Sequence, residues 1–174
     1  MLAAAGYDPR QWTDFFVLVG TGSATLAGLV FVAMTINSRV VTADATHKYR
    51  AINMLTGFTA AFILSAFALM GHQTHRSLGI EWLLVAAIAG AINTNGYVQA
   101  FRLHSSRYAL SPSRIVGGSV CYLGQVVAAL LLYDGTRAGI YVAAIALIVN
   151  FSFFVSGAWL LIVGTLQDLD ETPG

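Results

Sequence analysis

Long apolar segments alternate with short polar ones along the chain. Segments of about 18 or more mostly apolar residues with few charges are typical of membrane-spanning helices. The sequence contains five of them, at 13–36, 52–70, 80–101, 115–133 and 139–164. None alternates with the period of two that membrane-spanning strands require. The expected fold is therefore all-α, a polytopic helical bundle in which residues 1–174 form a single transmembrane domain.

The connections between these segments are short and contain residues that commonly begin or end helices. Asp8-Pro9 and Ser111-Pro112 each read as a capping residue followed by proline at the first helical position. Asp134-Gly135 is a tight-turn signal, and Thr136 is placed to cap the helix that follows. Because the loops are short, consecutive helices are expected to be antiparallel neighbours.

Composition agrees with a membrane protein and excludes several other classes. The chain is 57% hydrophobic and 10% charged, whereas soluble domains carry about 25% charged residues. The net charge is +1, and no basic stripe suggests a nucleic-acid partner. The single Cys121 excludes an intramolecular disulfide and a thiol metal site. The N-terminus lacks the pattern of a cleavable signal peptide.

The lysines and arginines predict the orientation, because cytoplasmic loops of membrane proteins are enriched in them. One side of the membrane would carry Arg10, Arg76 and Arg137. The other side would carry a larger set, namely Arg39, Lys48, Arg50, Arg102, Arg107 and Arg114. We therefore expect the larger set to lie on the cytoplasmic side of the membrane. The N-terminus would then be outside and the C-terminus inside.

The stretch GAINTNGY, at 90–97, is unusually polar for the middle of an apolar segment. In a continuous helix, Asn95 and Gln99 share one face, while Asn93 and Tyr97 lie on another. A helix broken at 93–96 is the alternative, because NTNG also has turn chemistry. Broken helices line ion sites in transporters, whereas amides in continuous helices commonly bond neighbouring helices together.

Other polar residues fall at similar depth in the fourth and fifth segments. They complete one candidate cluster, expected either to line a pore or to join helices: Asn93, Thr94, Asn95, Gln99, Gln125 and Asn150. A second candidate feature is a stripe of small residues in the first segment. Such a stripe favours close helix packing and alternatively fits the wall of a narrow pore; it consists of Gly20, Ser23, Ala24, Ala27 and Gly28.

Chemistry that depends on charges or metals has little support in the sequence. No acidic or basic residue lies deep in any segment, so proton-coupled transport is disfavoured. His72 and His75 are three residues apart, but two ligands make an incomplete metal site. No catalytic or nucleotide-binding motif is present. We therefore expect no enzyme activity, catalytic residue, metal or cofactor.

The N-terminal block resembles a family of small multi-pass bacterial membrane proteins frequent in actinobacteria. The resemblance rests on W-x-D-F-F at 12–16, followed by A-x-L-x-G-L-x-F-V-A at 24–33 and Asn37. SLGIEWL, at 77–83, is also similar. Some members of that group are labelled as modulators of the membrane protease FtsH. The resemblance implies a multi-pass protein of the bacterial plasma membrane and brings no catalytic or binding residues.

These observations lead to two functional hypotheses. The first is a homo-oligomeric pore or channel-like protein, with the polar cluster lining or supporting its conduit. The alternative is a non-conducting accessory or modulator subunit of a membrane protease or respiratory complex. In both cases the expected partners are the lipid bilayer and either further copies of the chain or a larger membrane complex.

Overall fold

The computed structural model of the chain describes residues 9–36, 38, 45–102 and 112–170. A short 3-10 helix, η1 (Pro9–Trp12), leads into the first of five long helices. These are α1 (Thr13–Ile36), α3 (Ala45–Leu69), α4 (His75–Arg102), α5 (Pro112–Tyr133) and α6 (Arg137–Asp170). All five are long enough and apolar enough to cross a membrane. The predicted all-α, multi-pass bundle is thereby confirmed.

Helix boundaries differ from the expected spans mainly at polar ends. The helices α3, α4, α5 and α6 each begin before the apolar segment that predicted them, because polar residues continue the helix outside the apolar stretch. Helix α4 runs unbroken through 93–96, so the alternative of a broken third span does not hold. The Thr94 hydroxyl donates to the Gly90 carbonyl at 2.8 Å, within the same helix. A continuous helix keeps every backbone polar group paired, as hydrocarbon demands.

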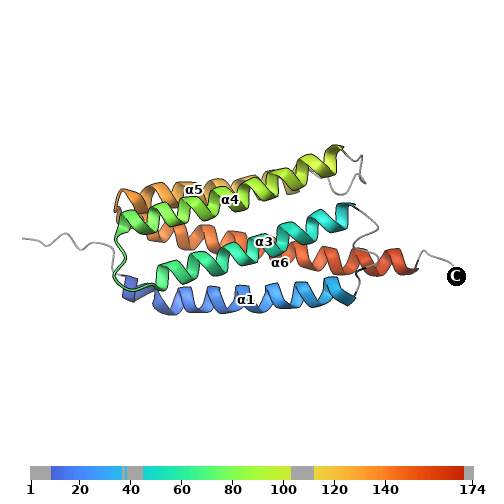
Figure 1. Cartoon of the computed structure of the whole chain (residues 1–174), viewed down its shortest axis with the longest axis horizontal. Coiled ribbons are helices and arrows are strands. Elements are labelled where there is room, and N and C mark those ends of the chain that lie inside the picture. Colours follow the sequence, from blue (N-terminus) through green and yellow to red (C-terminus); the bar gives the residue numbers. More distant parts are fainter. Residues whose placement is uncertain (1–8, 37, 39–44, 103–111, 171–174) are drawn as a thin grey trace, which may run out of the picture.

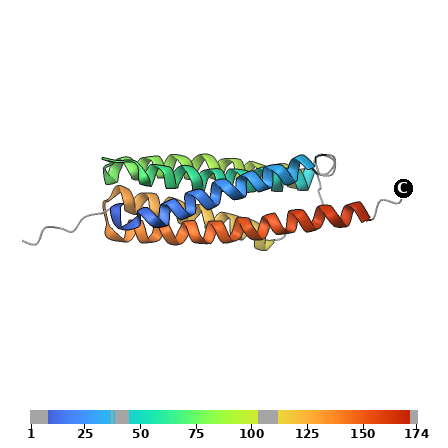
Figure 2. The same cartoon turned by 90° about the horizontal axis from the view of Figure 1, so that it is seen from below.

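Four of the helices form a closed ring. Helices α3, α4, α5 and α6 each pack against the next, and α6 packs back against α3. Helix α1 lies outside this ring against α3, with a small contact to α6. Consecutive helices run in opposite directions (Figure 1), as their short connections require. The C-terminal part of α6 extends beyond the other helices (Figures 1 and 2).

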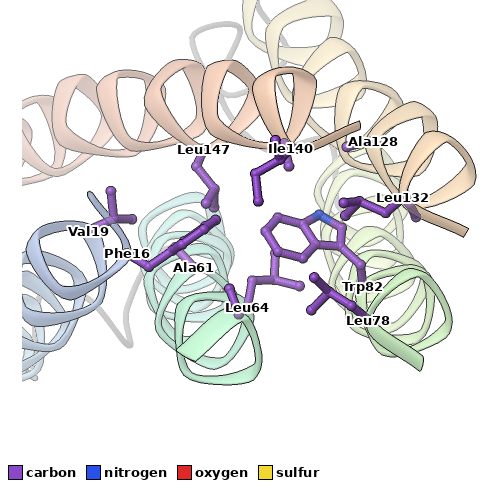
Figure 3. Packing of buried hydrophobic residues seen from close by; sticks show 13 residues of the cluster. Phe16, Val19, Ala61, Leu64, Leu78, Trp82, Ala128, Leu132, Ile140 and Leu147 are labelled. Carbon is purple, nitrogen blue, oxygen red and sulfur yellow. The ribbon is translucent and has the colours of Figure 1, made fainter. Parts of the chain in front are cut away.

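The end of the ring that holds residues 70–74 and 134–136, here called the turn end, has an apolar core. Trp82 is its largest fully buried side chain. Figure 3 shows the Trp82 indole reaching from α4 toward the centre of the ring, near Leu64 and Ile140. The ring of Phe16 from α1 lies edge-on to it, with the two ring centroids 6.2 Å apart. Aromatic and aliphatic side chains therefore fill the ring axis at this end.

Glycine lets the helices meet closely at the turn end. A Cβ on Gly79 of α4 would lie 2.6 Å from the backbone nitrogen of Tyr133. Gly135 has a φ of +69°, the left-handed conformation that glycine adopts without strain. Thr136 does not cap α6 with its side chain as expected. Its hydroxyl instead donates to the Leu131 carbonyl at 3.0 Å and caps the end of α5. Asp8 and Ser111, the other two expected caps, lie outside the described residues.

Candidate functional site

Three of the four ring helices carry a carboxamide at the centre of their buried face. These side chains are Asn93 of α4, Gln125 of α5 and Asn150 of α6, with exposed fractions of 4%, 1% and 6%. Each stands one helical turn from buried apolar residues on the same face. A carboxamide facing hydrocarbon without a partner is costly. The ring therefore keeps these amides out of the lipid.

Gln125 has a partner for only one end of its amide. The Trp82 indole N–H donates to Gln125 Oε1 at 2.7 Å, and this hydrogen bond is buried. Gln125 Nε2 is buried without a partner, and so is Asn150 Oδ1. Buried polar groups in proteins are nearly always paired, either with protein or with ordered water. These two atoms mark places in the ring where water or a solute would be stabilised.

A small cavity opens toward the end of the ring opposite the turn end. Its volume is about 50 Å³. It is lined by residues of α3, α4 and α6, namely Arg50, Asn53, Met54, Asn93, Tyr97, Phe153, Phe154 and Gly157. We call this cavity the vestibule. It brings Asn93 together with three polar side chains that lie on two helices.

Two glycines make room for the polar side chains of the vestibule. A Cβ on Gly96 of α4 would lie 2.9 Å from Asn53 Oδ1. A Cβ on Gly118 of α5 would lie 2.8 Å from Tyr97 Oη and 3.3 Å from Asn93 Nδ2. The distances of 2.9 and 2.8 Å are shorter than the contacts that real Cβ atoms make with their neighbours. Glycine at these two positions therefore lets Asn53, Asn93 and Tyr97 sit directly against helix backbone.

Arg50 is the charged side chain among the described residues that line the vestibule. Arg50 stands two residues inside the apolar segment Lys48–Leu69 of α3. Its side chain is half-buried. The vestibule therefore places a guanidinium near the carboxamides of Asn53 and Asn93.

The structure divides the predicted polar cluster into separate groups. Asn93 lines the vestibule, while Gln125 and Asn150 lie elsewhere in the ring interior and do not line it. Thr94 and Asn95 are exposed on the outer side of α4. Gln99 is half-buried and is not among the vestibule residues.

Sequence reasoning missed three of the four polar residues of the vestibule. It took Arg50 as an orientation signal, placed Tyr97 on the face of Asn93 without selecting it for the cluster, and did not select Asn53. The available signal was spacing on α3, where Arg50, Asn53 and Gly57 recur at i, i+3 and i+7 on one face. Gly57 is buried against the ring of Phe154, which identifies that face as inward.

Only part of the small-residue stripe of α1 packs against another helix of the chain. Gly20 and Ser23 are buried, and a Cβ on Gly20 would lie 3.2 Å from Ser65 Cβ of α3. Ala27 is half-buried, whereas Ala24 and Gly28 are exposed. One edge of the stripe therefore packs on α3, and the other edge faces away from the bundle.

The histidines of the turn end do not assemble a metal site. His72 and His75 are both exposed, and His72 has a φ of +62°. Glu81, the nearby carboxylate, accepts a hydrogen bond from Gln73 Nε2 at 2.7 Å. Within the part of the chain that the structure describes, no group of three or more His, Cys, Asp or Glu side chains could hold a metal ion.

No protein-family model, curated protein or solved structure matches this chain.

Proposed function

We propose that this small multi-pass membrane protein forms a conduit for small polar solutes along the axis of its four-helix ring. In the conformation described, the conduit is closed at Trp82. The observation that carries the proposal is the set of inward carboxamides, Asn93, Gln125 and Asn150, of which the last two keep unpartnered buried atoms. The vestibule provides an entrance at one end of the same ring.

Water is the natural partner for the unpartnered amide atoms. A buried water typically makes about three hydrogen bonds to protein groups that would otherwise be unsatisfied. Water reaching Asn150 Oδ1 and Gln125 Nε2 from the vestibule would convert this half of the ring into a hydrated path. Amides and hydroxyls can then replace part of the hydration shell of a permeating solute.

The other half of the ring axis supports a hydrophobic gate. The Trp82 indole lies in an apolar cluster that includes Leu64, Leu132 and Leu147. A constriction of this kind stops conduction because water does not wet it. The hydrogen bond from Trp82 to Gln125 ties the indole to α5 across the ring interior. Opening would require this bond to break and the indole to leave the axis.

Asn93 and Asn95 are a matched pair for testing the conduit. They are the same residue type, two positions apart on α4, but Asn93 is buried and Asn95 is exposed. Asn93→Leu is expected to reduce solute flux into liposomes that contain the purified protein, because it removes an inward amide. Asn95→Leu is expected to leave flux at the wild-type level. Equal incorporation of the two variants into vesicles is the control.

Other results would point away from a conduit within one chain. A loss of flux in Asn95→Leu but not in Asn93→Leu would place the conducting path between copies of the protein, as in the homo-oligomeric pore expected from the sequence. Wild-type vesicles that conduct no ion or small neutral solute under any imposed gradient would refute both forms of the proposal.

A second candidate function, an accessory subunit or self-associating protein, is favoured by the outer face of α1. The seven residues on this face follow the alternating spacing of four and three that lets two helices pack along a shared seam. All are exposed: Asp14, Leu18, Thr21, Thr25, Gly28, Val32 and Thr35. The resemblance to proteins labelled as FtsH modulators agrees with such a role.

Filling the open position on this face should test the second candidate. A Cβ on Gly28 has nothing within 4 Å among the described residues, so Gly28→Ile should leave the fold intact. If the α1 face binds a second copy or a partner, the variant loses that association in native mass spectrometry of gently extracted membranes. Ala87→Ile, at an exposed position on α4, is the control. Identical complexes in all three proteins would exclude this face as the contact.

A further inference from the structure

We infer that the conduit carries a small uncharged solute that both donates and accepts hydrogen bonds, such as water or urea, along a file of four buried side chains. The file consists of Asn93, Asn150, Tyr122 and Gln125. The inference rests on the proposed function and adds to it a class of solute, a path and one further residue, Tyr122. It depends on the order of these side chains along the ring, on their unpartnered atoms and on their lack of charge.

Close contacts at glycines give the height of both asparagines along the ring. Across the contact between α4 and α5, a Cβ on Gly118 would lie 3.3 Å from Asn93 Nδ2. Across the contact between α5 and α6, a Cβ on Gly124 would lie 3.6 Å from the Cβ of Ala146, one turn before Asn150 on α6. Because α5 and α6 are antiparallel, Asn150 lies roughly 6 Å nearer the vestibule than Gly124 does. The two asparagines therefore lie at nearly the same height.

Tyr122 occupies the next level toward the turn end. A Cβ on Gly90 of α4 would lie 3.8 Å from the Cβ of Tyr122, and Gly90 stands about one turn nearer the turn end than the asparagine of α4. Tyr122 is buried in a cluster with Phe58 of α3 and Phe154 of α6, so its phenol lies inside the ring. Gln125, about one turn further along α5, comes last in the file.

The last three members of the file present polar atoms that lack a protein partner. Asn150 Oδ1, Tyr122 Oη and Gln125 Nε2 are all buried and unpaired. The orientation of the Gln125 amide is determined, because the Trp82 indole N–H can only donate and Oε1 accepts from it. Gln125 therefore offers a donor, Asn150 an acceptor, and the phenol can serve as either. A solute that moves along the file meets both kinds of group.

The file is uncharged, which favours a neutral solute over an ion. Among the described residues, the buried polar side chains other than the tyrosine are serine, asparagine and glutamine. An ion that leaves water for such surroundings loses hydration at a large cost in free energy. An anion would also meet Asn150 Oδ1, and a cation the amino group of Gln125, both of which repel it. A neutral solute with a donor and an acceptor keeps both of its groups paired.

Tyr122→Phe tests the path. It keeps the ring and removes a hydroxyl that has no partner in the closed conformation, so it should not destabilise the fold. Urea flux into liposomes that contain the purified protein can be followed by light scattering after rapid mixing. It should fall about fivefold, as expected for the loss of one hydrogen bond. Tyr133→Phe, the same change at an exposed position of the same helix, should leave the flux at the wild-type level.

Ion fluxes in the same vesicles test the class of solute. Wild-type vesicles should pass urea and water and exclude potassium and chloride. Potassium or chloride flux as fast as urea flux would overturn this inference and leave the conduit standing, and so would equal urea flux in the wild type and Tyr122→Phe. Vesicles that pass none of these solutes would refute the conduit itself, and this inference with it.

Discussion

Replacing Gly79 by valine is expected to destabilise the protein by roughly 3 kcal/mol or more, at the upper end of the cost of overpacking. The atoms that a new Cβ would meet are the backbone nitrogen and Cα of Tyr133, at 2.6 and 2.7 Å. Backbone inside a helix cannot move aside as the end of a flexible side chain can. The α4 and α5 helices would have to separate at the turn end, where the apolar core lies.

Gly28→Val provides the matched control for this substitution. It adds the same side chain to a glycine in the middle of a membrane-spanning helix, at a position with open space around it. Unfolding of each purified variant in detergent, followed by circular dichroism against temperature, measures the difference. Gly79→Val should melt far below wild type, and Gly28→Val close to it. Similar melting temperatures for the two variants would mean that α4 and α5 are not as closely packed as described.

Trp82→Ala is expected to have the second largest effect, a loss of about 3–5 kcal/mol of stability. The substitution removes the largest fully buried side chain and leaves a void among the leucines of the turn end. It also removes the donor of the hydrogen bond to Gln125 Oε1. Both ends of that buried amide would then lack a protein partner, which adds a desolvation cost to the cost of the void.

Trp159→Ala is the control for Trp82→Ala, because it removes a tryptophan that is not buried. Trp159 is 67% exposed, so its removal should change stability by less than about 0.5 kcal/mol. Equilibrium unfolding with a denaturing detergent gives both values. Trp82→Ala carries a second expected result if the gate is as proposed, namely higher flux than wild type in vesicles. A stable Trp82→Ala variant would contradict the packing, and an unstable one with unchanged flux would contradict the gate alone.

Length and apolar patterning were sufficient to predict the architecture. Apolar segments that cross lipid must pair their own backbone groups, which favours helices. Because the connections are short, consecutive helices must be antiparallel. The inward face of each helix was less accessible from the sequence. These helices are apolar nearly all round, so a hydrophobic stripe does not distinguish the buried side as it does in soluble proteins. Asn93 and Asn95 look equivalent in the sequence, yet only Asn93 faces the ring.

The vestibule was harder to predict because it depends on contacts between distant segments. Arg50 near the start of an apolar segment has the pattern of an orientation signal, and nothing local indicates that its side chain lines a cavity. Gly96 and Gly118 matter because Asn53 and Tyr97 lie against them, and those approaches exist only after the helices have packed. Asn93, Gln125 and Asn150 could be selected from sequence because carboxamides are unusual at that depth.

Closure of the ring by the last helix has a consequence for biosynthesis. The contacts along α3, α4 and α5 join neighbours in the chain, whereas the contact between α3 and α6 joins distant segments. A nascent chain that has inserted α3 to α5 therefore has an open side. Through that side Asn93 and Gln125 meet lipid or the insertion machinery. Chains truncated before Arg137 would keep these amides accessible, and a membrane quality-control protease could distinguish them from finished molecules by that exposed polarity.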